Sequence, residues 1–588
     1  MSSDPENPMR RIPCLLPLAM LLTLAACGSP TPQATPRPTD TARLRPTNTP
    51  PPTATAYASA TPAEEQAGRE GEPLAAKVGE FFSTSGACAV CHMNQTDDAG
   101  NDVSIDAAWR ASVMANSARD PYWQATVRAE VSEMPDLAET IQNTCTRCHM
   151  PMAQFTAEQQ GAGTAVFGEN AFTDSENELH AFAMDGVSCT VCHQIRSDNL
   201  GTQASYSGGF QIDTQLRRPD RVIFGPFTIA PDQAQIMAGA SGYQPAQSAH
   251  LSKSELCATC HVLYTPYVDA HGQVAGDFPE QMTYFEYYYS SFRNRNTCQE
   301  CHMPEAEGGV KISLTSETLR SPFSQHTFVG GNAFMLKMLD QYGEELDVTA
   351  SSGQFAAGIA HTVDQLQNDT AILALDNAQR VGARVSAEAA LTILTGHKFP
   401  TGFPSRRAWL HITLTDGAGE LVFESGAVNP DGSIAGNDND ADPTQFEQHY
   451  QAIVQPEQVQ IYEAILRDTE NHVTTDLLRA AGYLKDSRLL PEGFEKAAPY
   501  EDFAVRGGAR EDVDFDGGGD RVLIAINTGG ASGPFTLTVE LLYQSIGFRW
   551  MENLKAYADQ AEVADFVRFT QGLPNLPVVI ASDSVTLE

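Results

Sequence analysis

The sequence predicts a mixed fold in two parts, the first mainly α-helical and irregular and the second mostly β and sandwich-like. Two observations carry this prediction. Five copies of the pentapeptide Cys-x-x-Cys-His fall within residues 88–302, and the chain between them is irregular apart from short helical patches such as 105–131. Beyond residue 380 the chain has no Cys, and short β-branched segments alternate with Gly, Asp and Asn turns, which is typical of a β-sandwich.

The pentapeptide is the attachment signature of c-type haem. Its two thiols add to the haem vinyl groups, and the His that follows becomes the fifth iron ligand. A zinc site or a disulfide framework does not require a His after every second Cys. We therefore predict five c-type haems, with thioether bonds from Cys88, Cys91, Cys145, Cys148, Cys189, Cys192, Cys257, Cys260, Cys298 and Cys301 and proximal ligands His92, His149, His193, His261 and His302.

The chain divides into two predicted domains after its leader. Residues 72–378 are predicted to form a pentahaem cytochrome c domain, in which the large apolar haems replace much of the protein core. Segment 332–378 has helical spacing and is expected to close this domain. Residues 379–588 are predicted to form a β-rich C-terminal domain with strands such as 407–416 and 535–545 and a terminal helix at 551–571. This C-terminal domain is expected to have a structural role or a role in docking.

The N-terminus predicts export. A short apolar run at 12–24 follows two Arg and precedes small residues, which is typical of a secretory signal peptide. Because Cys27 follows the small residues directly, residues 1–26 are predicted to be a lipoprotein signal peptide and Cys27 the lipidated residue. Residues 27–71 form a Pro/Thr-rich tether. We expect a protein anchored by lipid at the outer face of a bacterial membrane, at the cell surface or in the periplasm.

The charge of the chain limits its partners. The formal net charge is −37, and haem propionates would add to it. Such a surface argues against binding nucleic acid or adhering to anionic lipid. It suits docking of a basic redox partner protein, although plain solubility explains the same charge equally well.

The sixth position of each iron decides what its haem can do. A His there gives a low-spin electron carrier, whereas an open position can bind a substrate. Nine of the 14 His lie outside the five motifs. Four of them are predicted distal ligands: His180 and His250 precede the third and fourth motifs, His326 follows the fifth motif, and His397 lies in a loop fixed by Gly and Pro.

The distal ligand of the remaining haem is left open. His361 and His271 are candidates, and Met114 could supply a thioether sulfur that raises the haem potential. Ordinary core packing is the alternative for this Met. Of the other three His, His411 is expected to be structural in a strand, and His449 and His472 are expected to face solvent.

Three further features each have two interpretations. Segments 436–443 and 511–520 place acidic oxygens around Gly, but neither has the terminal Glu of a twelve-residue calcium loop. We interpret them as solvated loops, with calcium as the less favoured alternative.

Arg406 and Arg407 either bind a haem propionate or are surface cations. Six aromatic residues before the fifth motif are expected to pack against haem faces, with a catalytic or relay Tyr as the alternative: Tyr284, Phe285, Tyr287, Tyr288, Tyr289 and Phe292.

Several phrases of the chain resemble multihaem cytochromes c of the cytochrome c554-like family. They are GVSCTVCH, SELCATCH, EQMTYFEYYYSSF, CQECHMP, HTFVGGN and GHKFPTGFPSRRAWL, and the likeness covers most of residues 84–588. The resemblance implies an extracytoplasmic electron carrier with a C-terminal β domain. It also implies that His180, His250, His326 and His397 are distal ligands, and it supplies no match for the fifth iron.

The favoured function is therefore electron transfer between membrane respiratory components and an external or periplasmic partner. Related pentahaem nitrite reductases carry one Cys-x-x-Cys-Lys motif at the catalytic haem, whereas all five motifs here end in His. A reductase or oxidase of a small nitrogen or sulfur compound at one five-coordinate haem is the alternative. A subunit of a polymeric cytochrome filament, formed by self-association, is the second alternative.

Overall fold

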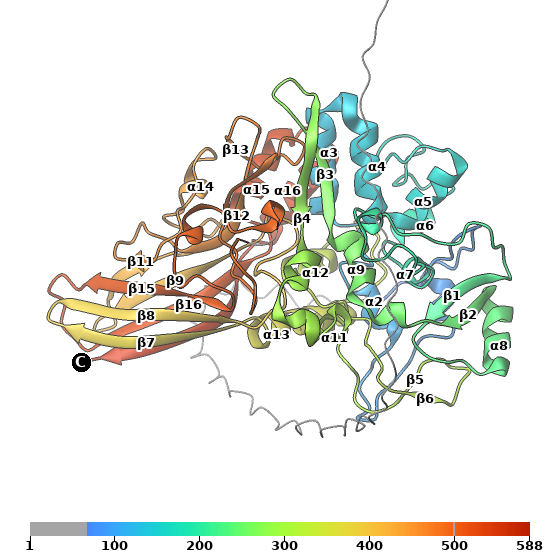
Figure 1. Cartoon of the computed structure of the whole chain (residues 1–588), viewed down its shortest axis with the longest axis horizontal. Helices are drawn as coiled ribbons and strands as arrows, with labels where there is room; N and C mark the ends of the chain where they lie inside the picture. The colour runs from blue at the N-terminus through green and yellow to red at the C-terminus, as the bar shows by residue number, and fades with distance from the viewer. Residues whose placement is uncertain (1–67, 498–499) are drawn as a thin grey trace, which may run out of the picture. The chain divides into compact units, whose positions relative to one another are not determined.

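The computed structural model describes residues 68–497 and 500–588, and these residues belong to one compact unit. The predicted signal peptide, the lipidation site Cys27 and most of the tether lie outside the described residues. Within the described ranges, no helix has the length and apolar character needed to cross a membrane. The prediction of a mixed fold of helices and sheets is confirmed (Figure 1).

The first part of the chain consists of short helices joined by irregular segments and three small pairs of strands. The strand pairs are β1 (Arg221–Gly225) with β2 (Tyr243–Gln247), β3 (Leu263–Val268) with β4 (Val274–Gln281), and β5 (Val310–Lys311) with β6 (Leu319–Arg320). The helices are α1 (Gly86–Ala89), α2 (Ile105–Arg110), α3 (Pro121–Glu133), α4 (Ala138–His149), α5 (Pro151–Gln160), α6 (His180–Met184), α7 (Cys189–Cys192), α8 (Pro231–Ser241), α9 (Ser254–His261), α10 (Thr283–Tyr288) and α11 (Cys298–His302).

Local sequence explains where the longest helix of this part begins. Asp120 caps α3, because its carboxylate accepts hydrogen bonds from the backbone N–H groups of Tyr122 and Trp123. Pro121 occupies the first helical position, where its missing N–H costs nothing. The cap therefore determines the position of Trp123, which contacts the second haem motif.

The predicted helical segment 332–378 is only partly helical. Helices α12 (Ala333–Gln341) and α13 (Ser352–Asn368) occupy most of it, and Ser351 and Gln354 form a capping box at the start of α13. The prediction is wrong for residues 371–378, which belong to strand β7 (Ala371–Val381) and pair with β8 (Arg384–Ile393). In this segment, packing of side chains across paired strands outweighs a weak helical periodicity of the sequence. The predicted boundary at 378 falls inside this strand.

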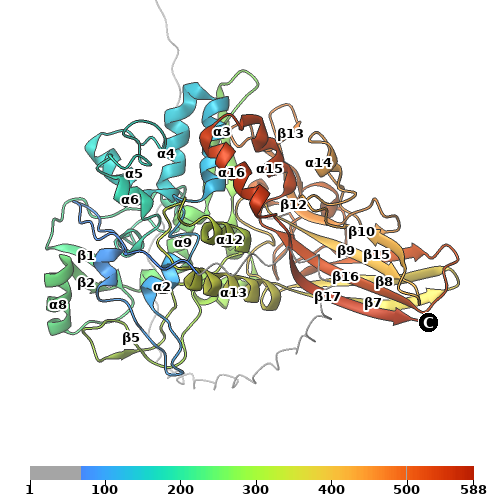
Figure 2. The same ribbon diagram turned by 180° about the vertical axis from the view of Figure 1, so that it is seen from behind.

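Two sheets form the second part. The larger has the order β13-β12-β9-β16-β17, with β10 also paired to β9 and β14 to β12, and the smaller has the order β11-β15-β8-β7. Figure 1 shows β7, β8 and β15 side by side, and Figure 2 shows β9, β16 and β17 from behind. The remaining strands are β9 (Arg407–Thr415), β10 (Leu421–Ser425), β11 (Ala452–Ile453), β12 (Ile461–Arg467), β13 (Val473–Thr474), β14 (Gly482–Asp486), β15 (Gly519–Asn527), β16 (Phe535–Gln544) and β17 (Val578–Leu587).

The inner faces of the two sheets share one apolar core. Alternate residues of β8 and β16 are buried, as expected for strands with one face covered. Buried side chains from both sheets belong to one cluster that includes Ala389, Leu391, Ile412, Val522 and Val539. The expected terminal helix is present as α15 (Phe548–Leu554) and α16 (Ala561–Gly572), but it is not terminal, because β17 follows and pairs along β16.

His411 has the structural role expected of it and predicts a pH dependence of stability. Its ring lies 3.0 Å from carboxylate oxygens of both Glu540 and Glu424. Burial lowers the pKa of His411, but the hydrogen bonds with the two carboxylates outweigh burial and leave its pKa raised. A raised folded pKa stabilises the fold fully below the unfolded pKa of about 6.5, and this contribution is lost as pH rises through the folded pKa.

The free energy of unfolding of the native chain is therefore expected to fall, by on the order of 1 kcal/mol, as pH rises above about 6.5. In the His411→Gln variant this fall is expected to be absent. Chemical denaturation at pH values on both sides of this point measures the effect. An equal loss in the native chain and the variant would contradict the prediction.

Candidate functional site

Each of the five Cys-x-x-Cys-His motifs lies in or at a short helix. The motifs begin in α1, α4, α7, α9 and α11, and helical spacing puts the first Cys, the second Cys and the His on one side. All ten motif thiols are free in the described residues, so none is committed to a disulfide. A thiol pair and an imidazole on one side of a helix fit the attachment of c-type haem.

The hydrogen bonds of the motif His residues prepare them to bind a metal. Nδ1 of His92 donates to the Ile312 carbonyl at 2.6 Å, and Nδ1 of His302 donates to the Val329 carbonyl at 2.6 Å. His149 and His193 make equivalent bonds to carbonyls at 3.0 and 2.7 Å. A carbonyl only accepts, so the proton is on Nδ1 and Nε2 keeps its lone pair for iron.

Two pairs of imidazoles have the spacing of axial ligands of one iron. The ring centroids of His193 and His326 are 6.4 Å apart with planes 13° from parallel, and those of His302 and His397 are 6.1 Å apart with planes 11° from parallel. Two imidazoles that bind one iron through Nε2 at about 2 Å have centroids about 6 Å apart. Two of the four predicted distal residues, His326 and His397, are thus brought opposite motif His residues.

The other two predicted distal His residues lie differently. Nδ1 of His180 donates to the Phe172 carbonyl at 3.0 Å, which leaves Nε2 available. Nε2 of His250 lies 2.7 Å from the Ile195 carbonyl and Nδ1 lies 2.6 Å from the Ser248 hydroxyl. Both ring nitrogens of His250 are therefore occupied, and this arrangement argues against the hypothesis that His250 binds iron.

Of the residues considered for the remaining iron, the two His residues are exposed. His361 is exposed on α13, and His271 is exposed in the turn between β3 and β4. The backbone carbonyl of Met114 accepts hydrogen bonds from the N–H groups of Ser117 and Val187. In the part of the chain that the structure describes, His92, His149 and His261 have no second imidazole in ring contact.

Two motif His residues have distinctive surroundings. The ring of Trp123 stacks on His149 with centroids 4.5 Å apart and planes 5° from parallel. Burial lowers the pKa of His149 to about 4, so its imidazole is neutral. His261 is the last residue of α9 and is exposed.

The five motifs are joined to one another. Thiols of different motifs lie close enough to shift one another's pKa: Cys88 with Cys189, Cys148 with Cys260, and Cys257 with Cys298. Direct bonds between the flanking chains accompany them. The Thr190 hydroxyl donates to the Ser83 carbonyl at 2.7 Å, and the Cys298 N–H donates to the Ser254 hydroxyl at 3.1 Å. Groups attached at these thiols would lie near one another.

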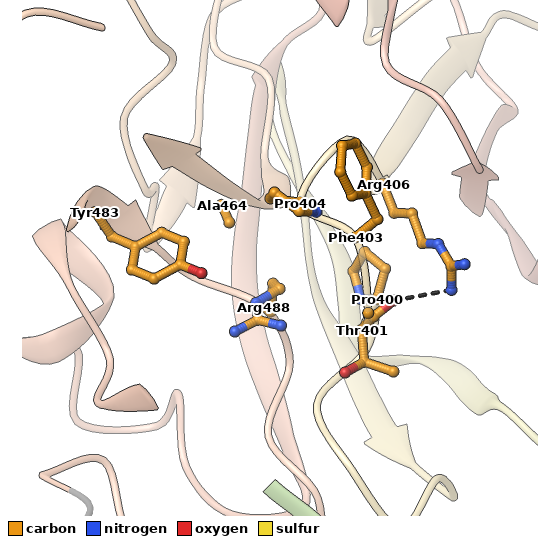
Figure 3. Close-up of a pocket in the computed structure, with 9 residues that line it drawn as sticks. Pro400, Thr401, Phe403, Pro404, Arg406, Ala464, Tyr483 and Arg488 are labelled. Carbon is orange, nitrogen blue, oxygen red and sulfur yellow. Dashed lines mark hydrogen bonds between the residues drawn. The ribbon is translucent and has the colours of Figure 1, made fainter. Parts of the chain in front are cut away.

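The second part of the chain contributes one of the iron-spaced imidazoles. His397 lies in the loop between β8 and β9, and Nδ1 donates to the Lys398 carbonyl at 2.9 Å. The Ser290 hydroxyl donates to the Gly396 carbonyl at 2.9 Å, which holds the loop against α10. Figure 3 shows the continuation of the loop from Pro400 to Arg406, where the Arg406 guanidinium donates to the Thr401 carbonyl at 2.9 Å.

A buried ion network anchors this loop. Lys398 is 2.6 Å from Asp486, which is also 2.8 Å from Arg488. Arg488 in turn is 2.8 Å from Glu286 on α10. All four side chains are at most 9% exposed. In Figure 3, Arg488 lies between Tyr483 and the Pro400–Thr401 segment. The network joins the β-rich part to α10 and was not foreseen, because its members are scattered in sequence.

The remaining predicted features resolve as follows. Arg407 is buried and pairs with Asp440 at 2.7 Å, so it is not a surface cation. The expectation that His449 faces solvent is wrong, because its side chain is 1% exposed and pairs with Asp512, whereas His472 is 71% exposed as expected. The aromatic residues before the fifth motif pack with one another, as the contacts of Tyr284 illustrate.

The acidic segment 511–520 contributes to one candidate cluster. Donor atoms of His449, Asp512 and Asp520 lie within 4.8 Å of one another. Both nitrogens of His449 are already hydrogen-bonded, to Asp512 and to Gln460. Calcium prefers six to eight oxygen ligands. The cluster therefore adds no support to the calcium alternative.

Comparisons with known proteins leave the family open. No family model matches the chain, and no curated protein matches it. Among solved structures, a penta-heme cytochrome c552 from Thermochromatium tepidum is similar, with 16% sequence identity over 85% of this chain and 97% of that chain and a TM-score of 0.47. This similarity is too low to carry an argument, and the resemblance to the cytochrome c554-like family stays a prediction.

Proposed function

We propose that this protein carries five covalently bound c-type haems and relays electrons outside the cytoplasm, between membrane respiratory components and an external or periplasmic partner. The observation that carries the proposal is the pair of imidazole couples, His193 with His326 and His302 with His397, each spaced for one iron. Haems with two His ligands are closed at both axial positions and suit electron transfer.

The contacts between motifs support a continuous route for electrons. The first motif touches the third through Cys88 and Cys189. The fourth motif touches the second through Cys260 and the fifth through Cys257. Cys192 contributes to raising the pKa of both thiols of the fourth motif, which supports a position of the third motif near the fourth. We infer a haem order of one, three and four, with haems two and five both next to haem four.

Charge and the N-terminal pattern support the proposed setting. The net charge of −37 favours a basic redox partner over nucleic acid. Lipidation of Cys27 would attach the protein to the outer face of a bacterial membrane, with residues 27–71 as a tether.

A second candidate function is reduction or oxidation of a small nitrogen or sulfur compound at one open haem. It is favoured by one observation: in the described ranges His92, His149 and His261 face no second imidazole at iron spacing. A haem that lacks a protein ligand at its sixth position can bind a small molecule. A filament in which a neighbouring subunit supplies the missing ligand is the further alternative.

Haem content and spin state test the proposal. Mass spectrometry of the purified protein is expected to find a haem on each of the five motif peptides. Electron paramagnetic resonance is expected to show at least two low-spin haems with two imidazole ligands, from the couples of His193 and His302. A motif peptide without haem, or the absence of such low-spin signals, would contradict it.

The same sample separates the alternatives. Binding of carbon monoxide or cyanide to one haem favours the enzyme, and the absence of binding to all five favours the relay. Filaments seen by electron microscopy favour the polymer, whereas a monomer in light scattering argues against it.

A further inference from the structure

Trp123 on α3 lies directly against the motif imidazole of the second haem motif. Its ring and that of His149 have centroids 4.5 Å apart and planes 5° from parallel. Two parallel rings at this distance overlap face to face with an offset, because side by side in one plane their edges would collide. The rings are too close for an iron between them, so Trp123 covers one face of the imidazole and is not its partner across a metal.

This contact distinguishes the second motif from the others. In the described ranges, His193 and His302 have ring contacts with His326 and His397, at 6.4 and 6.1 Å. Among the same residues, no indole or phenyl ring stacks on a motif imidazole other than His149. The electron-transfer function proposed above does not explain why one motif has an indole in this position.

Hydrogen bonds hold both partners of the stack. Nδ1 of His149 donates to the Ser117 carbonyl at 3.0 Å, and the Ser117 hydroxyl donates to the backbone carbonyl of His149 at 2.8 Å. Three residues after Ser117, the Asp120 carboxylate accepts the backbone N–H of Trp123 at 3.1 Å. Segment 117–123 therefore holds the imidazole at one edge and places the indole against one of its faces.

Packing fixes the indole as well. Trp123 is 8% exposed and belongs to an apolar cluster that includes Val127, one turn further along α3, and Ile141 on α4. Figures 1 and 2 both show α3 and α4 side by side. Because the interior is close-packed, the indole cannot turn away from His149 without opening a cavity.

The second part of the chain holds the helix that carries Trp123. Arg128 on α3 forms two hydrogen bonds with Glu562 on α16, at 2.7 and 2.8 Å. Further along α3, the Glu130 carboxylate accepts a hydrogen bond from the N–H of Leu477 at 2.8 Å. The position of the indole on the imidazole therefore depends on contacts with residues far away in the sequence.

An indole in this position acts on the charge of the imidazole. A His that binds iron gives electron density to the metal, so its ring is more positive with Fe(III) than with Fe(II). The face of an indole is negative and attracts positive charge. The stack therefore favours the oxidised state and lowers the reduction potential.

We propose that Trp123 is a positioning residue for the haem attached at Cys145 and Cys148: it fixes the orientation of the His149 ring and lowers the potential of that haem. The hydrogen bond at Nδ1 holds one edge of the ring and the indole holds one face, so rotation of the ring is limited from two directions. This proposal rests on the electron-transfer function above.

Replacement of Trp123 tests the proposal. Potentiometric titration of the holoprotein, followed by haem absorbance, resolves the haem components. Trp123→Leu keeps an apolar side chain but removes the aromatic face. It is expected to raise the potential of one component and to broaden its paramagnetic resonance signal, because the His149 ring can then take more than one orientation. Trp123→Phe keeps an aromatic face and is expected to shift the same component less.

Fluorinated tryptophan separates the electronic effect from packing. The chain has 4 Trp, and growth with 5-fluorotryptophan replaces all of them by rings of nearly the same shape and a less negative face. Incorporation is expected to raise the potential of the same component in the native chain and to leave it unchanged in Trp123→Phe. If Trp123 only filled space, incorporation would shift no potential, and the proposal would be overturned.

Trp409→Phe is the matched control. Trp409 is fully buried on β9, where its Nε1 donates to the Gly426 carbonyl at 2.9 Å, and it packs with side chains of the β-rich part. Its replacement is expected to lower the free energy of unfolding and to leave all haem potentials unchanged. An equal shift in Trp409→Phe and Trp123→Phe would show that the shift follows from lost packing, and would overturn the proposal.

Failure of this proposal differs from failure of the function on which it rests. Absence of haem from the Cys145 peptide would overturn both. Five haems whose potentials are unchanged in Trp123→Leu and after fluorination would overturn the role of Trp123 alone. If Trp123→Leu lowers haem content, the comparison of fluorinated native protein with fluorinated Trp123→Phe decides.

Discussion

Replacing His397 with Ala is expected to convert one of the five proposed haems from low-spin to high-spin. His397 lies opposite His302 at the spacing of one iron, and Ala leaves no nitrogen in that position. Optical and paramagnetic resonance spectra measure the change, and the new high-spin haem is expected to bind carbon monoxide. His326→Ala is expected to do the same to a different haem, the one attached through His193.

The matched control for these variants is His361→Ala. His361 is exposed on α13, so its loss is expected to leave all spin states unchanged. An unchanged spectrum for His397→Ala would mean that the β-rich part supplies no ligand. The contact between the two parts would then be structural only.

Replacing Asp486 with Ala is expected to lower the free energy of unfolding by about 3–5 kcal/mol, because it leaves buried charges without a partner. Asp486 is 1% exposed and is the anion shared by Lys398 and Arg488. Since Lys398 follows His397 directly, the same change is expected to loosen the loop and weaken the low-spin signal of the haem at His302. Chemical denaturation, followed separately by circular dichroism and haem absorbance, measures both effects.

The charge network also predicts behaviour in acid. Burial raises the pKa of Asp486, but Arg488 and Lys398 outweigh burial and hold its pKa far below the ordinary value. The stabilisation is therefore complete above the unfolded pKa of about 3.9 and is lost only as pH falls towards the depressed folded value.

Asp376→Ala is the control for Asp486→Ala. The ion pair of Asp376 with Arg521 is 45–47% exposed and is expected to contribute no more than about 1 kcal/mol to the free energy of unfolding. An equal loss in both variants would contradict the role given to burial.

Some features could be read from the sequence because they are local. The five motifs need only positions i, i+3 and i+4 of a short helix, and the five motif His residues follow from the same pentapeptide. The alternating segments at 407–416 and 535–545 became β9 and β16, because a period of two has one buried face. The prediction of a helix over 371–378 was wrong, because this segment pairs with β8 across a turn. Helical periodicity within the segment contains no information about that partner strand.

Other features depend on contacts between distant segments. The sequence predicted four distal His residues and did not distinguish among them. Only the fold shows that His326 and His397 lie opposite motif imidazoles and that a carbonyl is bonded to Nε2 of His250. His449 was expected in solvent because its neighbours are polar, yet it is buried against Asp512, 63 residues away.

By itself the sequence determined how many haems to expect and which thiols and proximal imidazoles would hold them, because covalent attachment is encoded within five consecutive residues. The tertiary structure alone decided which imidazoles lie opposite motif His residues and which motifs lie next to one another. Those properties depend on distances and burial between residues up to several hundred positions apart, and a one-dimensional pattern contains neither.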